Sequence, residues 1–204
     1  MFIRVILILA LSLFMTLSAD DELKEIYKTG NEVSMKLLKN LGKNLKKEMK
    51  SSGIVGAIEF CHTNAYPLAE KFNSNLPEGI SVKRVSSKYR NPVNKPLQDE
   101  EKILKAIEDS FEVTPKGLLQ EVSEGEYKFY KPLRIAKPVC LKCHGNSDQI
   151  PAPIQKFLKE NYPEDRAVDY KMRDLRGAIV VTIKKPVTKD SETAETEVEV
   201  EEDK

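Results

Sequence analysis

The chain of 204 residues has no tryptophan, only two histidines and only three cysteines. Three cysteines are too few for a domain built on disulfide bonds, and an odd number leaves one thiol to be explained. Basic and acidic residues nearly cancel, 33 against 32, so the large basic excess of a nucleic-acid-binding protein is missing. Any metal chemistry therefore depends on a short set of soft ligands, namely Cys61, Cys140, Cys143, His62, His144 and a few methionines.

One long apolar run is present, and it stands at the N-terminus. Val5 to Leu17 is almost uninterrupted, Arg4 precedes it, and Ser18-Ala19 before Asp20-Asp21 has the form of a signal-peptidase site. This run of 13 residues is shorter than the ~20 residues of a membrane-spanning helix. We therefore expect residues 1–19 to be a secretory signal peptide, with a retained anchor as the alternative. The mature chain would begin near Asp20, lack a membrane span and be periplasmic.

The C-terminal end is set apart by its charge. Residues 190–204 carry eight acidic side chains and one lysine, a net charge of −7, with no glycine, proline or aromatic residue. A segment with so little apolar surface predicts a solvated, disordered acidic tail. Without Arg4 and this tail, residues 20–189 carry a net charge of +7 and form one domain of ordinary size. The tail would serve solubility or, as the alternative, mask the basic body.

Apolar spacing predicts two helices in the first half of the body. A repeat of about four residues predicts a helix over residues 21–50, which Gly30 and Gly42 weaken. A second helix is expected over residues 54–73, with a kink or a break at Pro67. The side chains that define these helices are Val33, Leu37, Leu41, Leu45 and Met49 in the first, and Ile54, Ile58, Cys61, Ala65, Leu68 and Phe72 in the second.

Alternating or β-branched segments then predict a sheet. Strands are expected over residues 80–86, 117–122, 127–135 and 177–183, with residues 123–126 as a hairpin turn. A loop rich in proline and asparagine over residues 89–96 and short helices over 99–111 and 154–160 complete the order. Helices first and an antiparallel sheet later predict an α+β domain.

The strongest chemical signal is Cys140-Leu141-Lys142-Cys143-His144. A C-x-x-C-H sequence in an exported protein is typical of covalent c-type haem attachment through two thioethers. The adjacent imidazole then becomes the proximal iron ligand. Three alternatives compete: a zinc site, which needs four nitrogen or sulfur ligands; a thioredoxin-like dithiol, which belongs to an α/β pattern absent here; and a structural Cys140–Cys143 disulfide. We expect one haem c.

The second axial ligand is open among Cys61, His62, Met172, Met49 and Met35. Met172 follows His144 by 28 residues and would give the His/Met pair that is common in small electron-transfer cytochromes. Cys61 is the cysteine left over from the motif, and it lies on the apolar face of its predicted helix. The ordinary alternative for Cys61 is a small buried hydrophobic side chain.

The chain resembles the family of single-haem, PAS-like c-type sensor domains first recognised in cyanobacteria and also found as extracytoplasmic modules of bacterial signalling proteins. The resemblance covers about residues 25–184 and is carried by Ala57 to Cys61, Ser87 to Pro96, Cys140 to Gly145, and Asp174 to Ile179. It implies a PAS-like antiparallel sheet with long N-terminal helices and one covalently attached haem. It also implies His144 as the proximal and Cys61 as the distal ligand, whereas His62 is outside the family pattern.

Other side chains are candidates for the haem surroundings. Arg90 and Asn91 are candidate contacts to a haem propionate, because a guanidinium pairs with a carboxylate through two hydrogen bonds. A loop-fixing bond to backbone carbonyls is the alternative for Arg90, and Lys88 and Arg84 are further candidates. Three aromatic residues either line the haem pocket or belong to the core: Tyr127, Phe129 and Tyr130.

A thiolate ligand favours ferric iron, so a His/Cys pair implies a low reduction potential. Release of Cys61 on reduction would open a position for a diatomic gas or move its helix, which makes a two-state switch. We therefore expect a non-enzymatic sensor of redox state or of a diatomic gas, acting on a separate periplasmic redox or signalling partner. The alternative is a periplasmic electron-transfer cytochrome c with His/Met ligation. A peroxidase-like enzyme would have only His62 in its support.

Overall fold

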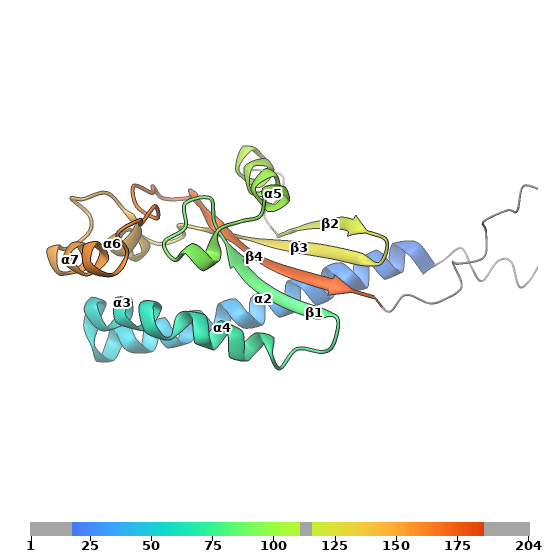
Figure 1. Cartoon of the computed structure of the whole chain (residues 1–204), viewed down its shortest axis with the longest axis horizontal. Helices are drawn as coiled ribbons and strands as arrows, with labels where there is room; N and C mark the ends of the chain where they lie inside the picture. The colour runs from blue at the N-terminus through green and yellow to red at the C-terminus, as the bar shows by residue number, and fades with distance from the viewer. Residues whose placement is uncertain (1–17, 111–115, 186–204) are drawn as a thin grey trace, which may run out of the picture.

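The computed structural model describes residues 18–110 and 116–185 (Figure 1). The predicted acidic tail lies outside these residues, as does the predicted signal peptide apart from its last two residues, which begin the first helix. That helix, α2 (Ser18–Ser51), runs along the molecule, and α3 (Gly53–Thr63) and α4 (Ala65–Asn73) fold back beside it. None of the described helices is both long enough and apolar enough to cross a membrane.

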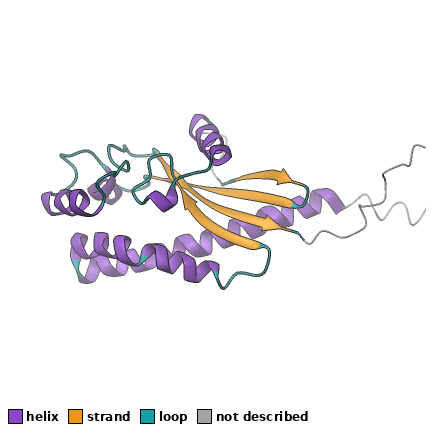
Figure 2. Ribbon diagram, in the orientation of Figure 1, coloured by secondary structure: helices purple, strands orange, loops and turns teal. Residues whose placement is uncertain are grey.

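The second half of the chain forms a sheet with short helices around it. Its strands are β1 (Ile80–Val85), β2 (Leu118–Ser123), β3 (Glu126–Arg134) and β4 (Leu175–Lys184). All pairs are antiparallel in the order β1-β4-β3-β2, with Val181 of β4 opposite both Val82 and Phe129 (Figure 2). The helices are η1 (Pro92–Asn94), α5 (Gln98–Asp109), η2 (Pro138–Cys140), α6 (Leu141–His144) and α7 (Ala152–Asn161). The predicted α+β class is confirmed.

Strand alternation gives the sheet two apolar faces. On β4, Ile179, Val181 and Ile183 pack with α2, whereas Ala178 and Val180 pack with α5. Strand β3 follows the same alternation, with Tyr127 and Phe129 toward α2 and Tyr130 toward α5. These three aromatic side chains are buried in the core of the sheet, so of the two predicted roles the structure assigns them the core.

The break predicted at Pro67 is present. The second helical segment divides at Asn64 into α3 and α4, and Pro67 is the third residue of α4. A proline there has no N–H to donate to the carbonyl one turn earlier, so the backbone bonds of a single helix cannot continue through this point. The division leaves α3 as a separate short helix beyond the end of the sheet, where it lies opposite α6 and α7 (Figure 1).

Helix α5 is held on the sheet by a buried carboxylate. Glu100 is fully buried, and one of its oxygens accepts a hydrogen bond from the Leu97 backbone N–H at 3.0 Å, at the start of the helix. The other oxygen lies 2.8 Å from Lys83 Nζ of β1 and 3.5 Å from Lys128 Nζ of β3. Burying a charge is tolerated only when it is paired, and the two lysines supply that pairing.

The two glycines of α2 predict opposite effects on stability. A Cβ at Gly30 would lie 2.4 Å from Phe129 Cβ, so Gly30→Ala should lower the free energy of unfolding by about 1–3 kcal/mol through overpacking. Around Gly42 no atom lies within 4 Å of such a Cβ, and Gly42→Ala should raise stability by about 0.5–1 kcal/mol through helix propensity. Urea unfolding of both variants measures this. Shifts of the same sign would contradict the packing of α2 on β3.

Candidate functional site

The cysteine motif lies at one end of the sheet, where η2 passes directly into α6. Cys140 packs on a buried cluster that includes Ile135 and Tyr170, whereas Cys143 packs on another that includes Ile58 of α3 and Ile154 of α7. Both thiols are half-buried, and burial raises the pKa of Cys143 to about 11. The motif therefore lies between the end of the sheet and the helices α3 and α7, and neither thiol is in a disulfide bond.

His144 is held in one orientation by the backbone. Its Nδ1 lies 2.9 Å from the Ala167 carbonyl oxygen, an acceptor, so Nδ1 carries the proton and Nε2 is left as the ligand nitrogen. The Tyr170 N–H donates to the His144 carbonyl at 2.9 Å, and the two rings meet edge to face with centroids 6.0 Å apart. Burial holds the imidazole pKa well below its usual value, so the ring is neutral, as a metal ligand must be.

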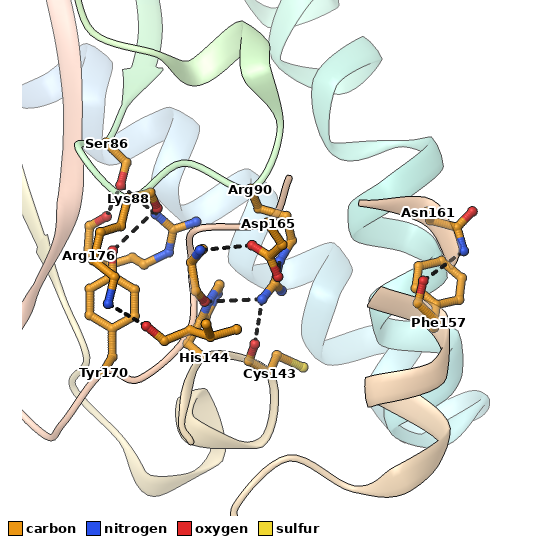
Figure 3. A network of polar contacts seen from close by, with 12 residues as sticks. Ser86, Lys88, Arg90, Cys143, His144, Phe157, Asn161, Asp165, Tyr170 and Arg176 are labelled. Atoms are coloured by element: carbon orange, nitrogen blue, oxygen red, sulfur yellow. Dashed lines mark hydrogen bonds and ion pairs between the residues drawn. The ribbon is translucent and has the colours of Figure 1, made fainter. Parts of the chain in front are cut away.

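Arg90 links the histidine to the loop that holds it (Figure 3). Its Nη2 donates to the carbonyls of Cys143 at 2.7 Å and of Ala167 at 3.1 Å, and its Nε pairs with Asp165 at 2.9 Å. The other Asp165 oxygen accepts from the Ala167 N–H at 2.8 Å. A largely buried ion pair thus holds Ala167 at two points: Arg90 donates to its carbonyl, which orients His144, and Asp165 accepts from its N–H.

Cys61 shares this site, although its surroundings differ from the sequence expectation. Ile58 and Ala65 on the same predicted stripe are buried, whereas Cys61 is exposed, so its predicted inward position is wrong. The reason is that α3 extends beyond the sheet and turns this part of the stripe toward α6 and α7. Although the residue is open to solvent on one side, protein atoms around its sulfur raise the thiol pKa through desolvation, and the nearby charges of Arg84, Arg90 and Arg176 oppose that rise.

Three further cations lie around this end of the sheet. Arg176 donates to Ser86 Oγ at 2.8 Å and to the Lys88 carbonyl at 3.2 Å. The Lys88 ammonium lies 4.4 Å from the centre of the Tyr170 ring and donates to the Val168 carbonyl. Within the described ranges, neither these two nor the half-buried Arg84 has a carboxylate at ion-pair distance. The site therefore has positive charge without a matching acid.

The remaining candidates are placed elsewhere or used locally. The His62 ring packs edge to face on Phe157 and Tyr162, with centroids 5.6 and 5.2 Å away. The Asn91 side chain accepts from the Val93 N–H at 3.1 Å and so caps η1. Met172 is 40% exposed in the turn before β4. In the described part of the chain, no group of three or more His, Cys, Asp or Glu side chains could hold a metal ion.

Two site residues had no role in the sequence interpretation. Asp165 lies 75 residues after Arg90, and no local pattern connects the pair. Arg176 stands inside a segment that carries the family resemblance, yet only folding brings it beside Ser86 and Tyr170. The one signal for it in the sequence was an arginine directly before Gly177, at the start of the predicted strand.

The chain is similar to known proteins of one family. The family model named Tll0287-like, described as Tll0287, matches residues 15–184, which include every element from α2 to β4. A similar solved structure is the crystal structure of the cyanobacterial haem protein Tll0287, with 27% sequence identity and a TM-score of 0.50. That match covers 60% of this chain and 70% of the other. No curated protein matches. The chain belongs to the Tll0287-like family.

Proposed function

We propose that this protein is an exported haem protein that senses redox state or a diatomic gas. Its single c-type haem would be attached through Cys140 and Cys143 and ligated by His144 and Cys61. The observation that carries the proposal is that the Cys61 thiol of α3 lies close to Cys143 of the C-x-x-C-H segment. The Ala167 carbonyl takes up Nδ1 of His144 and so leaves Nε2 for a ligand. The similarity to a solved haem protein of the same family supports it.

The residues present fit this cofactor. Two unoxidised thiols in one helical turn suit two thioether bonds, and a neutral imidazole with its Nδ1 proton held by a carbonyl suits a proximal ligand. The excess positive charge of Arg84, Lys88 and Arg176 suits the carboxylates of the propionates, and we assign these contacts to them. When bound, the haem supplies one-electron redox chemistry and a coordination position.

The protein groups around Cys61 suit a ligand that exchanges. Desolvation favours the neutral thiol and raises its pKa, whereas the guanidinium groups of Arg84, Arg90 and Arg176 oppose that rise by favouring the thiolate. Cys61 lies on the short helix α3, which packs along α2 and ends two residues later, before Asn64. Helix α3 can therefore pass a change at Cys61 to α2 and to a separate periplasmic partner.

The competing functions have less support at this site. Met172 belongs to the segment that bonds to the backbone of His144 through Tyr170, and it is exposed there. An electron-transfer cytochrome with a His/Met pair would need this side chain on the opposite side of the cofactor. His62, the one candidate for peroxidase-like acid–base chemistry, contacts the Phe157 and Tyr162 rings edge to face. We accordingly propose no enzymatic activity.

Secretion in a host that attaches c-type haem tests the proposal. The periplasmic protein should begin near Asp20 and carry the mass of one haem that survives denaturation. Cys140→Ser and Cys143→Ser should each remove one thioether, and the double variant should lose covalent haem entirely. Mass spectrometry and the absorption spectrum of the denatured protein measure both. An unprocessed chain would contradict export, and a processed chain without added mass would contradict the haem assignment.

A further inference from the structure

Helix α2 carries a row of lysines along the C-terminal half of its outer face. At 100° per residue, six lysines fall within an arc of about 100°. All are exposed: Lys36, Lys39, Lys43, Lys46, Lys47 and Lys50, here called the lysine stripe. Leu37 and Leu41, which pack in the core beneath the sheet, lie on the opposite side of the helix. The stripe therefore faces away from the sheet.

The positive charge of the lysine stripe is not neutralised within the structure. Glu48 is the one acidic residue between Lys36 and Lys50, and it lies outside the arc of the stripe. No lysine of the stripe forms an ion pair with any residue in 18–110 or 116–185. The negative C-terminal end of a helix favours lysine only in its last turn, so this effect does not explain Lys36, Lys39 or Lys43.

We infer that the acidic segment 190–204 of the same chain docks on the lysine stripe. The charges match, because residues 195–203 hold six acidic side chains against the six lysines. The valines and threonines between the acids alternate with them, so an extended segment would present its carboxylates on one side. No other stretch of this sequence has comparable negative charge without basic residues.

The chain has the length to reach. Lys185, the last described residue, forms an ion pair with Glu22 near the start of α2. The helix rises about 21 Å from Glu22 to Lys36 and by about the same distance from Lys36 to Lys50. The 19 residues from 186 to 204 span up to about 63 Å when extended. About seven residues reach Lys36, and the remaining twelve or so pass along the stripe.

Because the acidic segment belongs to the same chain as the lysine stripe, weak charge pairs are sufficient to hold it there. Individual exposed ion pairs are weak, but a tethered segment acts at a high effective concentration, and several pairs form together. A docked segment would cover the most basic face of α2, the helix against which α3 and its Cys61 pack. An acidic partner surface would have to displace the segment to bind there, so the tail would regulate access to the stripe.

Zero-length cross-linking between amines and carboxylates tests the docking on the processed, full-length protein. Cross-links from residues 190–204 should concentrate on the lysine stripe at low salt and fall at least ~fivefold in high salt, where charge interactions are screened. The variant with Lys39, Lys43, Lys46 and Lys50 changed to Gln should lose the remaining tail cross-links to Lys36 and Lys47 to a similar extent. The matched control changes Lys102, Lys105, Lys156 and Lys159 to Gln, four exposed lysines on α5 and α7, and should keep the pattern.

Mixing normal and isotope-labelled chains separates the occupants. Cross-links within one chain support the proposal, whereas cross-links between chains would assign the stripe to a second copy and overturn it. Tail cross-links spread evenly over lysines outside the stripe would also overturn it, as would a pattern unchanged by the four substitutions on α2. These cross-links join residues 190–204 to lysines of α2, none of which is assigned to the haem, so their outcome is separate from that of the proposed function. The haem content of each sample is measured by absorption as a control.

Discussion

Cys61→Ala is expected to abolish the low-spin thiolate signature in the spectra of the purified ferric protein while leaving the haem covalently attached. The proposed thioethers depend on Cys140 and Cys143, so loss of the α3 thiol would remove a ligand and not the cofactor. The reduction potential should rise, because an anionic sulfur that stabilises ferric iron is gone. Electron paramagnetic resonance, optical spectra and a redox titration measure these three effects.

Three variants make this result specific. Met172→Ala should leave the spectra unchanged, since its side chain lies exposed in the turn before β4. His62→Ala should alter packing between α3 and α7 without changing the ligand signature. Cys61→Ser, which keeps the size of the side chain, should behave like Cys61→Ala. If both Cys61 substitutions leave the spectra unchanged and Met172→Ala alters them, the sensor proposal is wrong and an electron-transfer cytochrome with a His/Met pair is favoured.

Asp165→Ala should be the most destabilising single change at the site. The side chains of Arg90 and Asp165 are only 11% and 9% exposed, and removal of the acid leaves a buried guanidinium without its partner. Breaking such a pair costs about 3–5 kcal/mol of unfolding free energy. Arg90→Lys should lose part of this stability as well, because an ammonium cannot supply the forked donors that reach Asp165 and the two carbonyls together.

A surface pair on α5 calibrates that effect. Lys105 and Asp109 are 75% and 62% exposed, so Lys105→Gln should change the unfolding free energy by about 0.5 kcal/mol or less. Denaturant unfolding of the haem-loaded variants gives the comparison. A role for Arg90 in holding His144 also predicts changed ferric resonance parameters in Arg90→Lys. Equal stability of Asp165→Ala and Lys105→Gln would show that the pair does not support the site.

Most of the fold could be read from local patterns. The helix expected over residues 21–50 is α2, the expected hairpin is β2–β3, and the break at Pro67 divides α3 from α4. These predictions succeed because apolar periodicity, proline geometry and β-branched runs act over a few residues. The prediction that Cys61 is buried was wrong, because periodicity shows which face of a helix is apolar but not how far the rest of the fold extends to cover that face.

The sequence by itself predicts the chemistry of the motif, since Cys140, Cys143 and His144 are neighbours and their spacing does not depend on the fold. It also shows the acidic composition of residues 190–204 and, by resemblance, predicts Cys61 as a ligand. Only the folded chain shows that Arg90 pairs with Asp165 and donates to the Ala167 carbonyl that orients His144. Such contacts join residues tens of positions apart. They arise from the packing of helices and strands, which no local sequence pattern predicts.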